Sequence, residues 1–259
     1  MHPNATQISD YSRTRFEAQT SYAATLSHDI YRRGAGAPVV LLQELPGIGQ
    51  ETLRLADELV NAGFEVVMPH LFGPIGKTSI AGNLARVMCL RKEFHLLSRD
   101  RSSPITDWIR QLCRHIRDES GTDGVGIIGM CLTGNFAIQL IGDESVLAAV
   151  ASQPAMPFFK QGSLHMSPAD IEQSRQALDS KGPMRLLRFD NDPLCTAAKS
   201  ACIHKAFNDD GAHRVREITL PGKGHSVLTL DFVDEAGHPT REALNNVIDY
   251  FTHQLKPSA

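Results

Sequence analysis

Short runs of β-branched and aliphatic residues alternate with segments of helical period from about Pro38 to the C-terminus, with turn residues between them. This alternation is typical of βαβ units, in which parallel strands are joined by helices that pack on the sheet. The sequence therefore predicts an α/β fold, with a doubly wound and mostly parallel sheet flanked by helices.

The pattern resolves into individual elements. Six segments are predicted as strands: residues 39–43, 64–68, 125–128, 147–151, 184–189 and 214–220. Six others are predicted as helices: residues 51–61, 105–117, 132–141, 169–179, 193–207 and 241–255. The second and last of these helices have an apolar face at helical spacing, which indicates helices lying on a sheet. Ser103 and Pro104 provide a cap and a first-turn proline for the second helix.

The chain of 259 residues has no internal repeat and no low-complexity linker, so we expect one domain over residues 1–259. Residues 1–37 are less regular and predict one or two edge strands, of which residues 28–32 are the better candidate. Residues 73–103 are harder to interpret, because several arginines lie among apolar residues without a clean strand. We expect this segment to be a helical excursion that covers a pocket.

The composition argues against several classes of protein. Lys and Arg number 26 against 29 Asp and Glu, a net charge of −3, which indicates no general attraction to nucleic acid or to an anionic membrane. The longest wholly apolar run, residues 146–151, is far shorter than the ~20 residues of a membrane-spanning helix. The polar N-terminus lacks the apolar core of a secretory signal, so we expect a cytoplasmic protein with five reduced cysteines, and a monomer by default.

The sharpest local motif is VGIIGMCLTG at residues 125–134, an apolar strand that runs into a turn of small residues and then a helix. In a nucleophile elbow such a turn lifts a reactive side chain clear of the sheet, and here that side chain is Cys131. The backbone N–H of Leu132 would point from the helix start and could stabilise an oxyanion or a thiolate. A buried thiol that only packs is the alternative. The GxGxxG pattern at residues 124–129 spans the strand itself, so we interpret it as chance rather than as a dinucleotide site.

A cysteine nucleophile needs a base, and a histidine base needs an orienting acid. The strand predicted at residues 184–189 ends in the sequence DNDP, and the strand at residues 214–220 is followed by PGKGH. The candidates Asp190, Asp192 and His225 therefore lie just beyond the carboxyl ends of predicted strands, where open α/β sheets place their sites. We favour Asp192 over Asp190 as the acid, although Asp192 could instead cap the following helix.

A fourth polar residue, Glu44, ends the first predicted strand after a nearly continuous apolar run, which is unusual for a carboxylate. It could exchange a proton with the Cys131 thiol, and the N–H of Leu45 would provide a second oxyanion donor. The alternative for Glu44 is a solvated loop position or a helix cap.

Four segments together resemble the dienelactone hydrolase family, cysteine hydrolases of the α/β-hydrolase fold: the strand end LLQELPGIG, the elbow GMCLTG, the acid segment FDNDP and the loop PGKGHS. The resemblance covers roughly residues 38–255. It implies that Cys131 is the nucleophile, His225 the base and Asp192 its orienting acid. It also implies that Glu44 is the carboxylate that helps to activate the thiol.

The same resemblance places the oxyanion hole at the N–H groups of Leu132 and Leu45. Three positions depart from the usual pattern of the family. Thr133 replaces the first of two glycines after the elbow, and His70 replaces the aspartate of a common Pro-Asp pair. Thr229 lies four residues after the histidine, where the best-known members have an arginine that holds a substrate carboxylate.

The leading interpretation is hydrolysis of a small ester or lactone through a thioester on Cys131. An anionic substrate could be held by Arg86 or Arg91, although such arginines are more often solvated. No metal or organic cofactor is required, and the sequence has no HExxH or paired CxxC motif. A non-hydrolytic small-molecule binding or sensing module on the same scaffold is the alternative, and a phosphotriester, a thioester or a small amide would suit the same residues as substrate.

Overall fold

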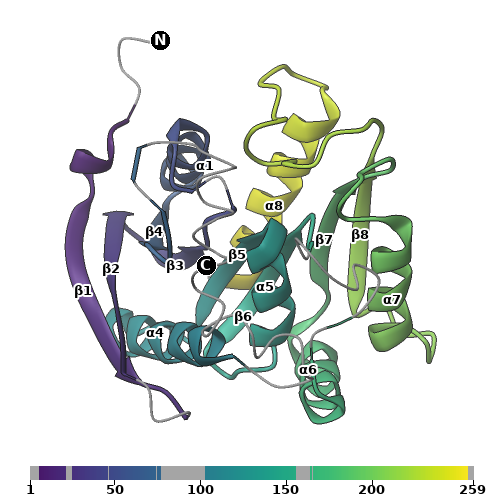
Figure 1. The fold of residues 1–259 in the computed structure, drawn as a ribbon, viewed down its shortest axis with the longest axis horizontal. Coiled ribbons are helices and arrows are strands. Elements are labelled where there is room, and N and C mark those ends of the chain that lie inside the picture. The colour runs from purple at the N-terminus through teal and green to yellow at the C-terminus, as the bar shows by residue number, and fades with distance from the viewer. Residues whose placement is uncertain are drawn as a thin grey trace.

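The computed structural model describes residues 6–21, 25–45, 47–73, 75–76, 103–155, 164 and 166–255. At its centre these residues form an eight-stranded sheet with the order β1-β2-β4-β3-β5-β6-β7-β8. Figure 1 shows the strands crossing the molecule from β1 at the left to β8 at the right. The strands are β1 (Ser12–Gln19), β2 (Thr25–Gly34), β3 (Ala37–Leu41), β4 (Phe64–Pro69), β5 (Val125–Met130), β6 (Val146–Ser152), β7 (Met184–Phe189) and β8 (Val215–Leu220).

The sheet is mixed but mostly parallel. β1 pairs antiparallel with β2, and β2 pairs antiparallel with β4, whereas every other pair from β4 to β8 is parallel. Within the described residues the α-helices are α1 (Gln50–Asn61), α4 (Pro104–Ser120), α5 (Gly134–Leu140), α6 (Pro168–Lys181), α7 (Ala197–Phe207) and α8 (Pro239–Leu255), the last of which follows β8. The same residues include the short 3-10 helices η1 (Ile8–Asp10) and η3 (Cys131–Thr133). The predicted fold class, a mostly parallel α/β sheet flanked by helices, is confirmed.

Two apolar cores cover the two faces of the sheet, because the central strands are buried on both sides and alternate residues face opposite ways. On β5, Ile127 belongs to one core and Ile128 to the other. Helices α4, α5, α6 and α7 contribute to the core of Ile127, and α1 and α8 contribute to that of Ile128 (Figure 1). Because the strands from β4 to β8 pair in parallel, their carboxyl ends lie at one edge of the sheet, and helices pack on both of its faces.

Most predicted element boundaries differ from the observed ones by a few residues, and three of these differences concern segments that border the site. The first central strand ends at Leu41 rather than at residue 43, so Gln43 and Glu44 both lie beyond the strand. The helix predicted at residues 132–141 begins as the 3-10 turn η3 and continues as α5. The helix predicted at residues 193–207 begins only at Ala197, because the Thr196 side chain caps it and the residues before it form a separate turn.

The N-terminal region forms the two strands β1 and β2, and residues 28–32 lie within β2. Of the segment at residues 73–103, only residues 73, 75, 76 and 103 are described. The predicted pocket-covering excursion therefore lies outside the described residues, as do Arg86 and Arg91. Ser103 caps α4 as predicted, since its side chain accepts a hydrogen bond from the backbone N–H of Thr106.

The glycines of the GxGxxG pattern serve packing. A Cβ atom at Gly126 would lie 2.8 Å from Leu255 and 2.9 Å from Phe251, so the glycine allows α8 to pack closely on β5. A Cβ atom at Gly129 would lie 2.2 Å from the carbonyl oxygen of Thr133, which no side chain could tolerate. Within the described part of the chain, no helix is long and apolar enough to cross a membrane.

Candidate active site

The turn after β5 holds Cys131 in a strained conformation. Its φ is +55°, a left-handed value that is costly for a side chain other than glycine, and the residue is buried. The absence of a Cβ atom at Gly129 lets the backbone of Thr133 approach closely enough to close this turn. Strand, sharp turn and helix thus follow one another as in a nucleophile elbow, with Cys131 at its apex.

Thr133, one of the departures from the family pattern, supports this elbow. Its hydroxyl accepts a hydrogen bond from the Met130 N–H at 2.9 Å and lies 3.1 Å from the carbonyl oxygen of Gln43. The Gln43 side chain in turn donates to the carbonyl of Phe72 at 2.8 Å and accepts from the N–H of Leu71 at 3.0 Å. Buried hydrogen bonds therefore connect the elbow to the carboxyl end of β3 and to the loop after β4.

Asp192 and His225 come together from the ends of β7 and β8. The Nδ1 atom of His225 lies 2.8 Å from Oδ2 and 3.0 Å from Oδ1 of Asp192, whose side chain is fully buried. The same carboxylate accepts hydrogen bonds from the backbone N–H groups of Leu194 and Cys195, at 2.8 and 2.9 Å. Asp192 therefore orders the turn ahead of α7 and also contacts the imidazole, whereas the cap of α7 itself is Thr196 rather than Asp192.

Asp190, the other candidate acid, points elsewhere. Its Oδ1 atom accepts hydrogen bonds from the Gly222 N–H at 2.9 Å and from the Asn191 side chain at 2.7 Å, and the residue is exposed. Within the described residues, the contact of His225 with a carboxylate side chain is made by Asp192. This geometry supports Asp192 rather than Asp190 as the orienting acid.

The second ring nitrogen of His225, Nε2, is buried and has no partner of ordinary hydrogen-bond geometry among the described residues. The Cys131 thiol is nevertheless close enough to the imidazole to raise its pKa. Burial lowers the pKa of His225, but hydrogen bonds with Asp192 and Cys131 and the attraction of both groups outweigh this and raise the pKa to about 10. Because Nδ1 faces Asp192, we assign Nε2 as the nitrogen that serves Cys131.

Glu44 lies beyond the end of β3 and is buried. Its carboxylate accepts hydrogen bonds from the hydroxyl of Ser226, at 2.9 Å, and from the hydroxyl of Thr229. Burial raises the pKa of Glu44, and this outweighs the hydrogen bonds and the attraction to His225 that oppose it. No hydrogen bond of Glu44 to Cys131 is found within the described residues, so proton exchange between the two stays a prediction.

The remaining predicted site residues divide into two groups. Leu132 lies in η3 directly after Cys131, and Leu45 lies in the turn after β3, both buried at the same edge of the sheet. Their role as oxyanion donors stays a prediction. Arg86 and Arg91 lie outside the described residues.

Sequence reasoning missed the residues that support the site. Asp231 accepts hydrogen bonds from the backbone N–H groups of His225 and Ser226, at 2.7 and 2.8 Å, and so orders the histidine loop. Ser226 had no role of its own in the predicted loop PGKGHS, yet its hydroxyl contacts Glu44. No periodicity marks such residues, because they act across loops that only the tertiary structure brings together.

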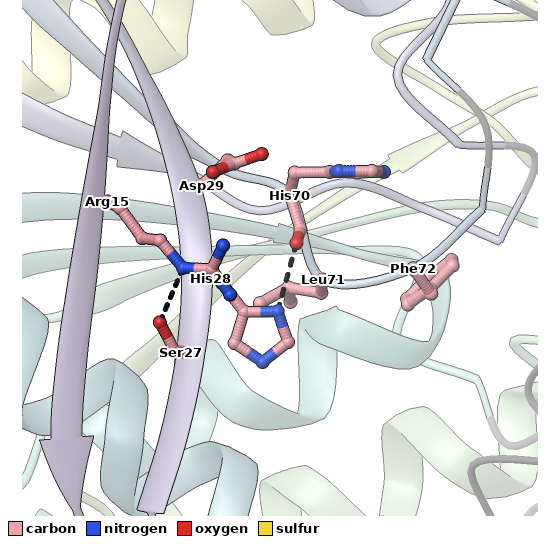
Figure 2. A pocket seen from close by; sticks show the side chains of 7 residues that line it. All are labelled: Arg15, Ser27, His28, Asp29, His70, Leu71 and Phe72. Carbon is pink, nitrogen blue, oxygen red and sulfur yellow. Dashed lines mark hydrogen bonds between the residues drawn. The ribbon is translucent and has the colours of Figure 1, made fainter.

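A pocket of about 230 Å³ opens near the carboxyl end of β4. Figure 2 shows Arg15 and Ser27 joined by a hydrogen bond and His28 directed at the backbone carbonyl of His70. The other residues that line it are Asp29, Leu71 and Phe72. It lies at the same edge of the sheet as Cys131 but beyond β3, and Gln43 connects its wall to the elbow.

The described residues contain no cluster of three or more histidine, cysteine, aspartate or glutamate side chains that could hold a metal ion. The arrangement that they do contain is a cysteine at a strained turn, an imidazole beside it and a buried carboxylate behind the imidazole. A thiol, an imidazole and a carboxylate in this order can carry out nucleophilic attack and proton transfer.

Comparison with known proteins gives a family and a fold. Residues 29–255 match the model of the dienelactone hydrolase family. No curated protein matches the chain significantly. Among solved structures, the chain is similar to a protein from Klebsiella pneumoniae subsp. pneumoniae assigned as a dienelactone hydrolase, with a TM-score of 0.63 and 15% identity over 93% of this chain and 99% of that one.

Two further solved structures share the fold. A cold-adapted esterase from an Arctic intertidal metagenomic library has a TM-score of 0.61 at 16% identity, covering 98% of this chain and 99% of its own. A dienelactone hydrolase-like promiscuous phosphotriesterase from metagenomic libraries has a TM-score of 0.60 at 14% identity, covering 94% and 99%. At these identities the likeness is one of fold.

Proposed function

Since the chain belongs to the dienelactone hydrolase family, we propose that it hydrolyses a small ester or lactone through a thioester on Cys131. The observation that carries this proposal is the position of His225. One ring nitrogen contacts the buried carboxylate of Asp192, and the Cys131 thiol is close enough to the ring to exchange a proton with it. This position of His225 supports the roles of nucleophile for Cys131, base for His225 and orienting acid for Asp192.

The proposed first half-reaction is acylation. His225 accepts the proton of the Cys131 thiol, and the thiolate sulfur attacks the carbonyl carbon of the ester. The N–H groups of Leu132 and Leu45 stabilise the negative charge on the carbonyl oxygen. As the tetrahedral intermediate collapses, the bond to the alkoxide oxygen breaks, and the imidazolium of His225 returns the proton to that oxygen. In a lactone the alcohol stays attached to the acyl group.

The second half-reaction is hydrolysis of the thioester. His225, oriented by Asp192, takes a proton from water as the water oxygen attacks the thioester carbon. The bond between carbon and Sγ then breaks, and the proton on His225 restores the Cys131 thiol. Asp192 stabilises the imidazolium that forms in both halves. In this scheme Glu44 acts on the loop of His225 through Ser226 and Thr229.

The proposal is tested by trapping the thioester. The protein is mixed with p-nitrophenyl acetate, quenched in acid within the first turnovers, and analysed by intact mass and peptide mapping. The expected result is one acetyl group on Cys131 and a loss of hydrolysis in Cys131→Ala. Turnover that survives in Cys131→Ala, or an acetyl group on another residue alone, would overturn the proposal.

A phosphotriester is the second substrate class to test with the same protein. The solved structure of the promiscuous phosphotriesterase shares the fold of this chain, and a thiolate can attack phosphorus as well as carbon. Paraoxon in place of the acetate ester gives a direct comparison of kcat/KM. A higher value for paraoxon would move the assignment to phosphotriester cleavage by the same residues.

A further inference from the structure

A buried lysine lies behind the proposed nucleophile. Lys199 is in the first turn of α7 and is fully buried, and its Nζ atom donates a hydrogen bond to Oδ1 of Asn135 at 2.8 Å. A lysine is almost never fully buried without a polar partner, because the loss of hydration is costly. Burial lowers the pKa of Lys199 to about 8, so the ammonium remains the main form at neutral pH. The proposed reaction does not use this group.

Asn135, the partner of Lys199, lies in α5 and reaches back to the elbow. Its Nδ2 atom donates to the carbonyl oxygens of Leu132, at 3.2 Å, and Ala155, at 3.1 Å. These contacts occupy both amide hydrogens and the amide oxygen. Only this orientation of the amide fits, because Lys199 can only donate and the two carbonyls can only accept.

The next contact reaches the peptide group of the nucleophile. The N–H of Ala155 donates to the carbonyl oxygen of Cys131 at 3.0 Å. That carbonyl belongs to the same planar peptide unit as the N–H of Leu132, the proposed oxyanion donor. In a trans peptide the C=O and N–H bonds point in opposite directions. Fixing the carbonyl of Cys131 therefore fixes the direction of the Leu132 N–H.

The other end of this series of contacts lies at the turn of residues 192–195, which we call the acid turn. Asp192 accepts hydrogen bonds from the backbone of Leu194 and Cys195, and the Thr196 cap of α7 follows directly. The N–H of Lys199 donates to the carbonyl oxygen of Thr196 at 2.9 Å. The base of the Lys199 side chain is thus fixed to the turn that orients His225, and its tip is fixed to the helix that follows Cys131.

We propose that Lys199 is a positioning residue that acts through Asn135 to align the Leu132 N–H with the acid turn. The inference rests on the proposed function, because it assigns to Leu132 the role of oxyanion donor. Among the described residues, no hydrogen bond of Lys199 to Cys131 or His225 is found, so we assign it no direct contact with the reacting atoms. Its effect falls on acyl transfer, in which an oxyanion forms, and spares reactions of the Cys131 thiol that form no oxyanion.

The test compares two reactions of the same thiol. Acylation by p-nitrophenyl acetate, followed as the burst of p-nitrophenol, forms an oxyanion, whereas alkylation by iodoacetamide displaces iodide without one. Lys199→Met keeps the length of the side chain and removes the ammonium. We expect it to slow acylation about tenfold, less than the roughly 10²–10³-fold cost of removing an oxyanion donor, with alkylation changed less than twofold.

Lys181→Met is the matched control. Lys181 is also a partly buried lysine, and its Nζ donates to the carbonyl oxygens of Ile141 and Asp143 near the far end of α5. This variant should keep the acylation rate of the parent. Thermal unfolding of each variant establishes that the measured protein is folded. Acylation and alkylation that fall together in Lys199→Met would indicate a distorted elbow and overturn the proposal.

Asn135→Ala provides a second, independent arm. If Lys199 acts through Asn135, then adding Lys199→Met to Asn135→Ala should slow acylation no further. Effects that multiply would overturn the proposal, as would parent-like acylation in Asn135→Ala. Failure of the proposed function is recognised separately, because turnover would then persist in Cys131→Ala.

Discussion

Nδ1 of His225 faces both carboxylate oxygens of Asp192, at 2.8 and 3.0 Å, and Asp192 also accepts two backbone N–H groups from the turn ahead of α7. The backbone of this turn therefore fixes the Asp192 carboxylate independently of its contact with His225. Asp190, two residues earlier, faces the backbone of Gly222 instead. The roles of these two aspartates in one short turn can be distinguished by experiment.

Asp192→Asn should lower kcat for p-nitrophenyl acetate by about 10²–10⁴, because the amide cannot stabilise the imidazolium and can favour the wrong tautomer. Asp190→Asn is the matched control, since its side-chain oxygen can still accept the Gly222 N–H. We expect it to stay within about twofold of the parent. A larger loss in Asp190→Asn than in Asp192→Asn would reverse the assignment of the acid.

Cys131 should be alkylated much faster than the buried cysteines Cys113 and Cys195. Burial raises the pKa of the Cys113 thiol, and it raises that of Cys195 to about 12, so neither forms a thiolate near neutral pH. Cys131 instead lies beside His225. Limited iodoacetamide treatment at pH 7 with peptide mapping checks this. Labelling of Cys195 at the rate of Cys131 would contradict it, and labelling in urea provides the unfolded reference.

Glu44→Gln should become more stabilising, relative to the parent, as the pH rises from about 4.5. The pKa of Glu44 is raised in the folded protein, above all by burial, so the folded state binds more protons than the unfolded state once the pH exceeds the ordinary glutamate value of 4.5. The free energy of unfolding of the parent therefore falls as the pH rises through this range. Glutamine has no proton to lose.

The measurement for Glu44→Gln is urea unfolding at several pH values between 4 and 8. The difference between variant and parent should grow and then level off above the folded pKa of Glu44. Asp231 and His225, the charged neighbours of Glu44, are present in both proteins. A difference that is constant with pH would show that Glu44 is not perturbed.

Thr133→Val should destabilise the protein by about 1–3 kcal/mol, because it keeps the shape of the side chain but leaves the buried Met130 N–H without its acceptor. Thr133→Ser restores a hydroxyl and should recover most of this loss. Urea unfolding at neutral pH provides both values. Equal stability of the valine variant and the parent would mean that the contact of Thr133 with Gln43 and Met130 contributes nothing measurable.

The local sequence pattern was sufficient to predict the α/β fold and the sharp turn at Cys131. The apolar run of β5 is buried on both faces of a parallel sheet, and such a strand is recognisable because every residue in it is aliphatic or small. The elbow was predictable for a similar reason, since the small residues around Cys131 are required by the turn itself. Gly129, for example, has a backbone oxygen where its Cβ would be.

The sequence alone could place Asp190 and Asp192 in one turn and Glu44 at the end of a strand, but the partner of each depended on loops distant in the chain. Asp192 faces His225, and Glu44 is held by Ser226 and Thr229, which no spacing rule connects. The burial of Lys199 and its contact with Asn135 were equally hidden, because a lysine in a helix is ordinarily solvated. Periodicity is a property of neighbours in sequence and determined the sheet, the helices and the elbow; burial and pairing across the carboxyl edge of the sheet are properties of the packed chain, and only the tertiary structure decided them.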